Sequence, residues 1–492
     1  MSNSQNLTES VRIVMQQSAN AFGAYQKTSA LQKASFLETI AANIESLGDA
    51  LIAKASEETN LPAARLTGER GRTTMQLRMF AQMLREGSWV EASVDTAIPD
   101  KNPPKPDIRK MLFPLGPVVV FGASNFPFAY STAGGDTASA LAAGCPVVVK
   151  AHPAHVQTSV MVAGAIEAAI KTCDMPEHSF QHVTDASFEA GKALVQDGNT
   201  AAVGFTGSYS GGKALYDYAA TRKNPIPVFA EMGSINPVIF LPDTLHTNAE
   251  NLAKQYAGSI TLGMGQFCTN PGLLIAIAGE GLDRFVSHLS REIANVVPAK
   301  MLHAGIHKAY FEKMRAALHE KGVALLAQSI AATTELEALP SVATVEGHVF
   351  LQNPLLHEEV FGPYSLLVIC KDEAELKAVW RSLAGQLTTT LMGTGKDFAN
   401  HHSLLEIAPA IAGRIVFNGV PTGVEVCPGM VHGGPFPAST DSRFTAVGIN
   451  AVKRWVRPVS YQNCPDALLP DALKESNPLG IWRLRNNEWG RK

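Results

Sequence analysis

The 492-residue sequence predicts an α/β fold built on an open, doubly wound parallel sheet. The main evidence is an alternation between short apolar segments and helical segments. The strand-like segments are 111–121, 146–150, 201–205 and 227–231, and helical segments such as 132–143, 156–171 and 211–220 lie between them. Strands that alternate with helices form parallel βαβ units. Such a sheet binds ligands beyond the carboxyl ends of its strands.

Helices are expected before this sheet, and a second α/β region is expected after it. Segments 7–54 and 57–86 carry apolar residues every three or four positions, with a break at Pro62. The second region begins near Gly233, with helices at 249–260, 282–296 and 307–321 and strands at 364–370 and 414–417. The Pro-rich segment 93–106 is expected to be a connector or an exposed ribbon. The tail from Tyr461 is expected to pack on a neighbouring subunit.

Length and composition favour a soluble protein of two or three domains. Apolar residues make up 46% and charged residues 17% of the chain, and the net charge of -3 gives no sign of a nucleic-acid partner or an anionic membrane partner. No apolar run reaches the ~20 residues that a membrane span needs. The six cysteines form no CxxC pair and no zinc-type cluster with histidine. This predicts reduced thiols, a cytoplasmic location and no metal.

Three side chains at turns are candidates for chemistry. Cys268 lies in the Gly-rich turn 265–269, which could present its thiol at a cleft, although most free cysteines are small buried apolar residues. Glu231 ends a strand, where partial burial would raise its pKa towards that of a general base; a solvated carboxylate is the alternative. Asn125 follows another strand and could donate to an oxyanion or simply cap a turn.

Two further segments could hold an anionic ligand. Segment 205–212 leads from a strand into a helix, and its glycines would let the backbone approach a phosphate at the helix N-terminus. Lys150 ends a strand, where it could meet a ribose or phosphate or be solvated at the sheet rim. The arginine-dense segment 65–73 is either a solvated helix face or an anion-facing wall of a pocket.

Taken together, six ordered blocks resemble the aldehyde dehydrogenase family over about residues 31–459. The blocks are 114–117 with 125–127, Lys150, 205–208 with Gly212, 231–233, 265–268 and 359–363. The resemblance implies an aldehyde dehydrogenase-like fold with a Rossmann-type cofactor domain, an α/β catalytic domain and a small oligomerisation ribbon. The resemblance implies a cofactor domain over residues 1–232, with the ribbon inserted at about 96–112. It implies a catalytic domain over 233–430. Residues 431–492 would form a C-terminal segment that returns to the cofactor domain and the ribbon. It also implies a homodimer or homotetramer.

The resemblance assigns roles to the candidate residues. Cys268 would attack an aldehyde, Asn125 and the Cys268 backbone N–H would hold the oxyanion, and Glu231 would activate the water that hydrolyses the thioester. The cofactor residues implied are Lys150, His152, Gly207, Ser208, Gly212, Lys213, Glu359 and Phe361. Three of them, Lys150, His152 and Lys213, are cations that could pair with a 2′-phosphate. Many family members that use NAD have Glu where this sequence has Pro153. We therefore expect NADP, with NAD as the alternative.

Departures from the wider family resemble one branch, the 2,5-dioxovalerate (α-ketoglutarate semialdehyde) dehydrogenases. The segments concerned are 66–72, 121–127, 134–138 and 150–155. A substrate with a 2-oxo acid end needs a cationic partner, for which Arg70 and Arg72 are the candidates. A related branch that oxidises long-chain fatty aldehydes with NADP is the alternative. A coenzyme A-acylating enzyme or a non-catalytic relative is disfavoured because Cys268, Glu231 and Asn125 are all present.

Overall fold

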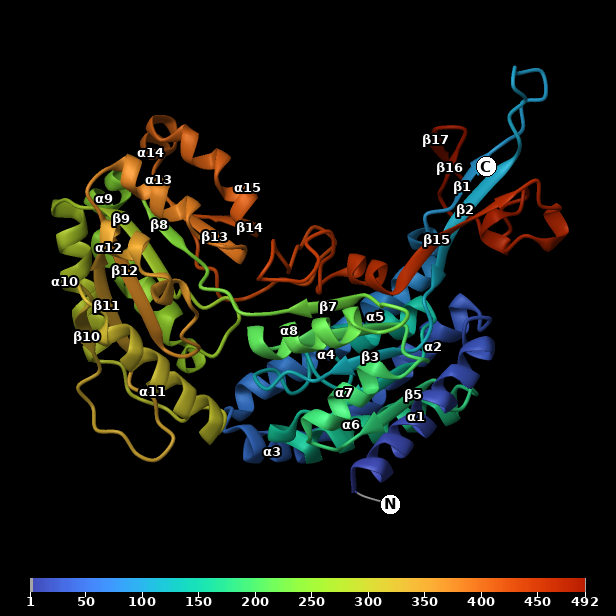
Figure 1. The fold of residues 1–492 in the computed structure, drawn as a ribbon, viewed down its shortest axis with the longest axis horizontal. Helices are drawn as coiled ribbons and strands as arrows, with labels where there is room; N and C mark the ends of the chain where they lie inside the picture. The colour runs from blue at the N-terminus through green and yellow to red at the C-terminus, as the bar shows by residue number, and fades with distance from the viewer. Residues whose placement is uncertain (1–2, 492) are drawn as a thin grey trace.

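The computed structural model describes residues 3–491. The first of its three sheets is parallel, in the order β5-β4-β3-β6-β7, and helices cover it (Figure 1). The strands are β3 (Val118–Phe121), β4 (Val147–Lys150), β5 (Phe180–Val183), β6 (Ala202–Thr206) and β7 (Val228–Glu231). The helices are α1 (Asn3–Tyr25), α2 (Ala30–Ser46), α3 (Gly48–Thr59), α4 (Ala63–Glu86), α5 (Gly135–Ala143), α6 (Val156–Thr172), α7 (Phe188–Gln196) and α8 (Tyr209–Ala220). The doubly wound fold predicted from the sequence is confirmed.

The second sheet has seven strands in the order β10-β11-β12-β9-β8-β13-β14, all parallel except the edge strand β10. Its strands are β8 (Val238–Phe240), β9 (Leu273–Ile277), β10 (Ala324–Gln328), β11 (Ser341–Glu346), β12 (Tyr364–Cys370), β13 (Gln386–Met392) and β14 (Ala412–Phe417). Its helices are α9 (Pro242–Thr261), α10 (Glu280–Ala294), α11 (Ala304–His319), α12 (Gly347–Gln352), α13 (Glu373–Arg381), α14 (Gly395–Asn400) and α15 (Ala408–Ile411).

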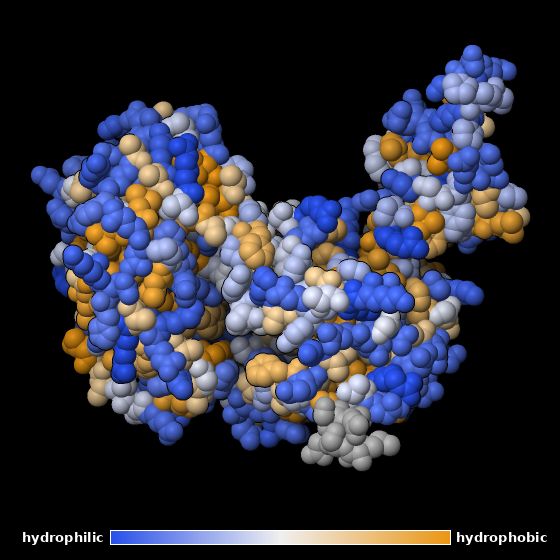
Figure 2. All heavy atoms as spheres, viewed as in Figure 1, coloured by the Kyte–Doolittle hydropathy of each residue, from blue (hydrophilic) through white to orange (hydrophobic). Residues whose placement is uncertain are grey.

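The third sheet, in the order β15-β2-β1-β16-β17, forms an arm that projects from the rest of the molecule (Figure 1). Its strands are β1 (Ser93–Asp95), β2 (Ile108–Pro114), β15 (Val456–Gln462), β16 (Arg483–Arg485) and β17 (Glu488–Gly490). Hydrophobic surface is visible on this arm (Figure 2). In the C-terminal segment that contributes β16 and β17, Leu468, Leu479, Trp482 and Trp489 are exposed. Apolar side chains left in solvent are typical of a surface that another chain covers.

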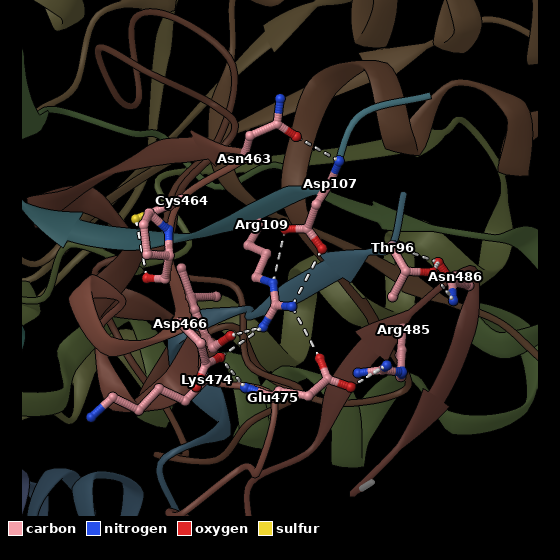
Figure 3. Close-up of polar contacts among 12 residues, drawn as sticks. Thr96, Asp107, Arg109, Asn463, Cys464, Asp466, Lys474, Glu475, Arg485 and Asn486 are labelled. Carbon is pink, nitrogen blue, oxygen red and sulfur yellow. Dashed lines mark hydrogen bonds and ion pairs between the residues drawn. The ribbon is translucent and has the colours of Figure 1, made fainter. Parts of the chain in front are cut away.

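Arg109 ties the arm to the C-terminal tail (Figure 3). Its side chain is buried and donates to the Leu473 carbonyl at 2.7 Å, and it forms ion pairs of 3.0 Å with Asp107 and with Glu475. Because a buried guanidinium is costly unless its charge and its donors are satisfied, this network fixes the tail against β2. The tail predicted to lie on a neighbouring subunit thus also adds β16 and β17 to a sheet of its own chain.

One predicted strand was wrong, whereas segment 7–54 is helical as predicted. Segment 111–121 is not one strand, because β2 ends at Pro114 in the arm and β3 begins at Val118 in the first sheet. Gly116 makes the change of direction, at a φ of 133°. Segment 7–54 contains parts of three helices. The predicted domain boundaries stay predictions.

Between residues 3 and 491 the structure contains no helix that is long and apolar enough to cross a membrane.

Candidate active site

The turn that carries Cys268 is held in a conformation that only particular residues can adopt. After α9, the short helix η3 (Leu262–Gly265) contains three residues with positive φ, ending at Gly265. A Cβ atom on Gly265 would lie 2.1 Å from the Gly362 carbonyl oxygen, so only glycine fits. The Asn236 amide donates to the carbonyls of Cys268 and Asn270, at 2.9 Å each. The turn therefore presents the thiol from a rigid backbone.

Cys268 has two polar neighbours from distant parts of the chain. Its Sγ lies 3.5 Å from Nε2 of His432, and the same Nε2 lies 3.1 Å from Oε1 of Glu231 at the end of β7. His432 is 1% and Glu231 4% exposed. The half-buried thiol and the buried imidazole and carboxylate thus form a chain of groups that can exchange a proton.

His432 reaches this position because its segment runs alongside β7. Glu231 forms an isolated antiparallel bridge with Ser439, and the Met232 N–H donates to the Ala438 carbonyl at 2.8 Å. The His432 N–H donates to the Thr445 hydroxyl at 2.9 Å. These contacts fix the imidazole across the end of the strand, next to the carboxylate.

Burial and charge set the protonation of the two reactive groups. Burial raises the pKa of the Cys268 thiol well above its usual range, and the nearby Glu231 carboxylate raises it further. Burial alone would also raise the pKa of Glu231, but His432 and the thiol hold it below its ordinary value. The expectation of a raised pKa at Glu231 was therefore wrong, because it counted burial without the imidazole. At neutral pH the resting pair is a thiol and a carboxylate.

Asn125 lies beside the cysteine turn, as predicted for an oxyanion donor. Its Nδ2 donates to the Gln266 carbonyl at 3.1 Å, and its own carbonyl accepts from Arg65 at 2.7 Å. The buried Glu69 carboxylate accepts from the N–H groups of Phe128 and Ala129, at 2.8 and 2.9 Å. Two side chains of α4 thus hold the loop that carries Asn125.

The two arginines predicted to bind the substrate lie on different faces of α4. Arg72 donates to the Tyr130 hydroxyl at 3.2 Å, and its charge lowers the pKa of the Cys268 thiol, against the larger effect of burial. Arg70 instead donates to the Gly48 carbonyl at 2.8 Å, at the start of α3. Because Arg65, Glu69 and Arg72 follow i, i+4, i+7 spacing, they share a face that Arg70 does not. We therefore retain Arg72 and not Arg70 as a substrate-binding candidate.

A further arginine, Arg414 on β14, lies close to the same site. Its guanidinium donates to the carbonyls of Pro421 and Gly423, while its buried Nε has no hydrogen-bond partner. Burial lowers the pKa of Arg414, and the Cys268 and Tyr130 side chains oppose that effect. The buried Nε of Arg72 also has no partner. Two cations with unfilled donors near one thiol can bind an anion.

The turn from β6 into α8 has the shape of a phosphate cradle. Ser208 caps the helix by accepting from the Gly211 N–H at 3.2 Å. A Cβ atom would lie 2.6 Å from the Phe205 ring at Gly207 and 2.6 Å from the Met232 side chain at Gly212, so a larger residue at either position would displace a neighbouring side chain. The backbone can thus approach a ligand at a helix N-terminus, where N–H groups favour phosphate.

The three cations predicted to bind a 2′-phosphate differ in whether they carry an available positive charge. Burial lowers the pKa of His152 to about 3, and its Nδ1 accepts from the Ala154 N–H at 3.1 Å, so it cannot supply a positive charge at neutral pH. Lys213 is paired with Asp217 at 2.7 Å on the exposed side of α8. Lys150, at the end of β4, keeps the predicted position. The prediction of a cationic His152 was therefore wrong, because its burial was invisible in the sequence.

Glu359 and Phe361 line a pocket next to the cysteine turn, together with Ser234, Gly265 and Phe267. A Cβ atom on Gly233 would lie 2.6 Å from Oε2 of Glu359, so the backbone of the general-base block touches this carboxylate. Burial raises the pKa of Glu359 to about 7. The carboxyl group can therefore accept or donate a hydrogen bond near neutral pH.

Residues 3–434 match the model of the aldehyde dehydrogenase family. The chain belongs to the aldehyde dehydrogenase family. Members use NAD(P)+ and act on small-molecule aldehydes, and the present enzyme oxidises an aldehyde to a carboxylic acid. The resemblance seen in the sequence is confirmed.

Two curated relatives of this aldehyde dehydrogenase cover nearly its full length. Alpha-ketoglutaric semialdehyde dehydrogenase 2 of Azospirillum brasilense is 49% identical, over 95% of this chain and 90% of its own. The alpha-ketoglutaric semialdehyde dehydrogenase of Acinetobacter baylyi is 46% identical, over 98% and 92%. Among solved structures, betaine aldehyde dehydrogenase of Staphylococcus aureus superposes with a TM-score of 0.78 at 18% identity, over 93% of this chain and 89% of its own. At that identity the likeness is one of fold alone.

Three residues of the dehydrogenase site, His432, Asn236 and Arg414, were not predicted from the sequence. The sequence motifs predict no role for His432 or for Asn236. Arg414 carried no signal beyond its place at a predicted strand. All three act across long sequence separations, which a single sequence does not reveal.

Proposed function

We propose that this enzyme oxidises 2,5-dioxopentanoate (α-ketoglutarate semialdehyde) to 2-oxoglutarate with NADP+. The observation that carries the proposal is the chain of Cys268, His432 and Glu231 with two arginines, Arg72 and Arg414, close to the same thiol. The names of the two curated relatives support the same substrate.

In the first half of the reaction, Cys268 adds to the aldehyde carbon. The thiol proton moves to Nε2 of His432, 3.5 Å away, in the neutral tautomer that carries its proton on Nδ1, and the Glu231 carboxylate stabilises the imidazolium that forms. A C–S bond forms, and the aldehyde oxygen becomes an oxyanion that accepts from the Asn125 amide and the Cys268 backbone N–H. NADP+, when bound, accepts the hydride. A thioester then remains on Cys268.

In the second half, water cleaves the thioester. Glu231 is ionised at neutral pH, because His432 holds its pKa below the ordinary value. Its carboxylate takes a proton from the attacking water as the new C–O bond forms. The C–S bond then breaks, and the sulfur recovers its proton from the His432 imidazolium, which restores the resting thiol. The proton on Glu231 passes to solvent.

The substrate contributes a carboxylate at the end opposite to the aldehyde. Arg72 and Arg414 each have a buried, unpartnered Nε–H. A buried cationic donor without a partner is costly, and an anionic ligand would remove that cost. A 2-oxo acid supplies both a carboxylate and an adjacent carbonyl to these donors.

The NADP+ part of the proposal rests on Lys150 and Pro153. Lys150 is the cation available for a 2′-phosphate once His152 is neutral and Lys213 is paired, and Pro153 brings no carboxylate that would repel it. The glycine cradle fits the pyrophosphate, and Glu359 and Phe361 fit the nicotinamide ribose. We further propose a homodimer or homotetramer assembled through the projecting arm.

The test is kcat/KM for α-ketoglutarate semialdehyde and for a long aliphatic aldehyde, each with NADP+ and with NAD+. A preference for the semialdehyde with NADP+ is expected. A preference for the aliphatic aldehyde would keep the mechanism but remove the role of the arginines. Equal use of NAD+ would mean that Pro153 only relaxes cofactor choice.

A further inference from the structure

Cys268, His432 and Glu231 offer three different metal-ligand atoms at one point. Their sulfur, nitrogen and oxygen atoms all lie within 4.8 Å of one another, and no other group of this kind occurs among the described residues. Thiolate, imidazole and carboxylate are the three ligand types that Zn²⁺ takes in proteins. The group joins a soft, a borderline and a hard ligand, so it suits a borderline cation better than Mg²⁺ or Ca²⁺.

The spacing of the donor atoms agrees with tetrahedral coordination. With bonds of about 2.3 Å to sulfur and about 2.0–2.1 Å to nitrogen and oxygen, neighbouring donors in a tetrahedral zinc site are about 3.4–3.6 Å apart. The separation from Sγ to Nε2 is 3.5 Å, and that from Nε2 to Oε1 is 3.1 Å. The third separation, from Sγ to the Glu231 carboxylate, is within 4.8 Å, so the carboxylate must move for all three donors to bind one ion at these separations. The protein would thus supply three ligands and leave a fourth position for water.

The Glu231 carboxylate has acceptor sites that a cation could fill, although His432 and the Cys268 thiol lie next to it. Its side chain is 4% exposed, yet neither of its oxygens has a hydrogen bond of normal geometry, although Nε2 of His432 approaches one of them. A buried carboxylate with unfilled acceptor sites is costly. A cation in contact with both the carboxylate and the thiolate would remove that cost.

We propose that Zn²⁺ binds reversibly at Cys268, His432 and Glu231 and inhibits the enzyme by occupying its nucleophile. Binding forms Zn–S, Zn–N and Zn–O bonds and releases the thiol proton to solvent, with no change of oxidation state. The inhibition rests on the proposed role of Cys268, whereas the binding does not. Zinc would therefore compete with the aldehyde for the same sulfur atom.

The experiment uses the full-length enzyme, freed of metal with a chelator, and Co²⁺ as a spectroscopic substitute for Zn²⁺. One Co²⁺ per chain is expected, with a sulfur-to-cobalt charge-transfer band and the intense visible bands of tetrahedral cobalt. Added Zn²⁺ should abolish the bands, and Mg²⁺ should leave them. In parallel, Zn²⁺ should inhibit aldehyde oxidation, and a chelator should restore it.

Variants decide whether the site is the proposed one. Cys268→Ser should remove the charge-transfer band, and His432→Gln should weaken Zn²⁺ binding at least about 100-fold, more than loss of a supporting contact does. Cys173→Ser and Cys427→Ser, at half-buried thiols elsewhere, are matched controls and should change neither binding nor inhibition. Circular dichroism of each variant checks that the fold is retained.

The two proposals fail in different ways. An active enzyme that binds no Co²⁺ through sulfur, or that retains the band in Cys268→Ser, would overturn the zinc site and leave the proposed function intact. An enzyme that binds one Co²⁺ through Cys268 but oxidises no aldehyde would overturn the function and leave the site intact.

Discussion

His432 lies with Nε2 3.5 Å from Sγ of Cys268, although 164 residues separate the two in the sequence. The same nitrogen lies 3.1 Å from the Glu231 carboxylate. Since burial raises the pKa of the thiol, an adjacent base is needed to generate the thiolate. We therefore infer that His432 helps to activate Cys268.

Replacing His432 by Gln should slow acylation. Loss of the base should lower the NADPH burst rate by roughly 10²-fold, and the alkylation of Cys268 by iodoacetamide should slow at neutral pH and recover as pH rises. Rapid mixing and timed alkylation measure these effects. If the burst rate and the alkylation profile of His432→Gln matched those of the wild type, His432 would have only a packing role.

Glu231→Gln should separate the two halves of the reaction. Because water activation needs the carboxylate, steady-state turnover should fall roughly 10²- to 10⁴-fold. A first burst of one NADPH per site should remain, and the thioester should accumulate on Cys268. Mass spectrometry of the quenched enzyme detects that adduct. If the rate of the NADPH burst and the steady-state rate fell by the same factor, Glu231 would act before hydride transfer.

Arg72→Met and Arg414→Met should each raise KM for the semialdehyde about 10- to 100-fold, as expected for a lost hydrogen bond to a charged group. Turnover of an uncharged aldehyde such as pentanal should change little, which also checks that the site is intact. Arg70→Met is the matched control on the same helix, because Arg70 contacts Gly48. A similar KM effect from Arg70→Met would contradict the assignment.

Pro153→Glu should shift cofactor use towards NAD+. The new carboxylate would lie where a 2′-phosphate is expected and repel it, so KM for NADP+ should rise about tenfold or more. Pro153→Ala controls for the loss of the ring. If Pro153→Glu and Pro153→Ala changed KM for NADP+ equally, the cofactor proposal would be wrong.

Lys33→Met should stabilise the protein at neutral pH. Lys33 is 8% exposed, and burial lowers its pKa from 10.5 to about 8, a cost of roughly 3 kcal/mol. Because the folded pKa is the lower one, the cost is fully present below pH 8 and fades as pH rises from about 8 towards 10.5. Urea unfolding at pH 7 and pH 10 should show the gain at pH 7 shrinking at pH 10.

Lys27→Met, at an exposed position, is the control for that measurement. It should change the free energy of unfolding little at either pH. A pH-independent gain in Lys33→Met would mean that the substitution acts through packing alone.

The sequence by itself determined the alternation of strands and helices, the turn of Cys268, and the strand ends that carry Lys150 and Glu231. These features depend on local periodicity and on glycines that a turn requires, so they can be read within a few residues. Tertiary structure alone decided which face of α4 meets the site, the burial that keeps His152 neutral, and the placement of His432 and Arg414. Those features depend on the antiparallel contact of residues 438–440 with the end of β7 and on helix packing. Such long-range contacts also set the pKa of Glu231, because the charge next to a carboxylate comes from a residue far away in the chain.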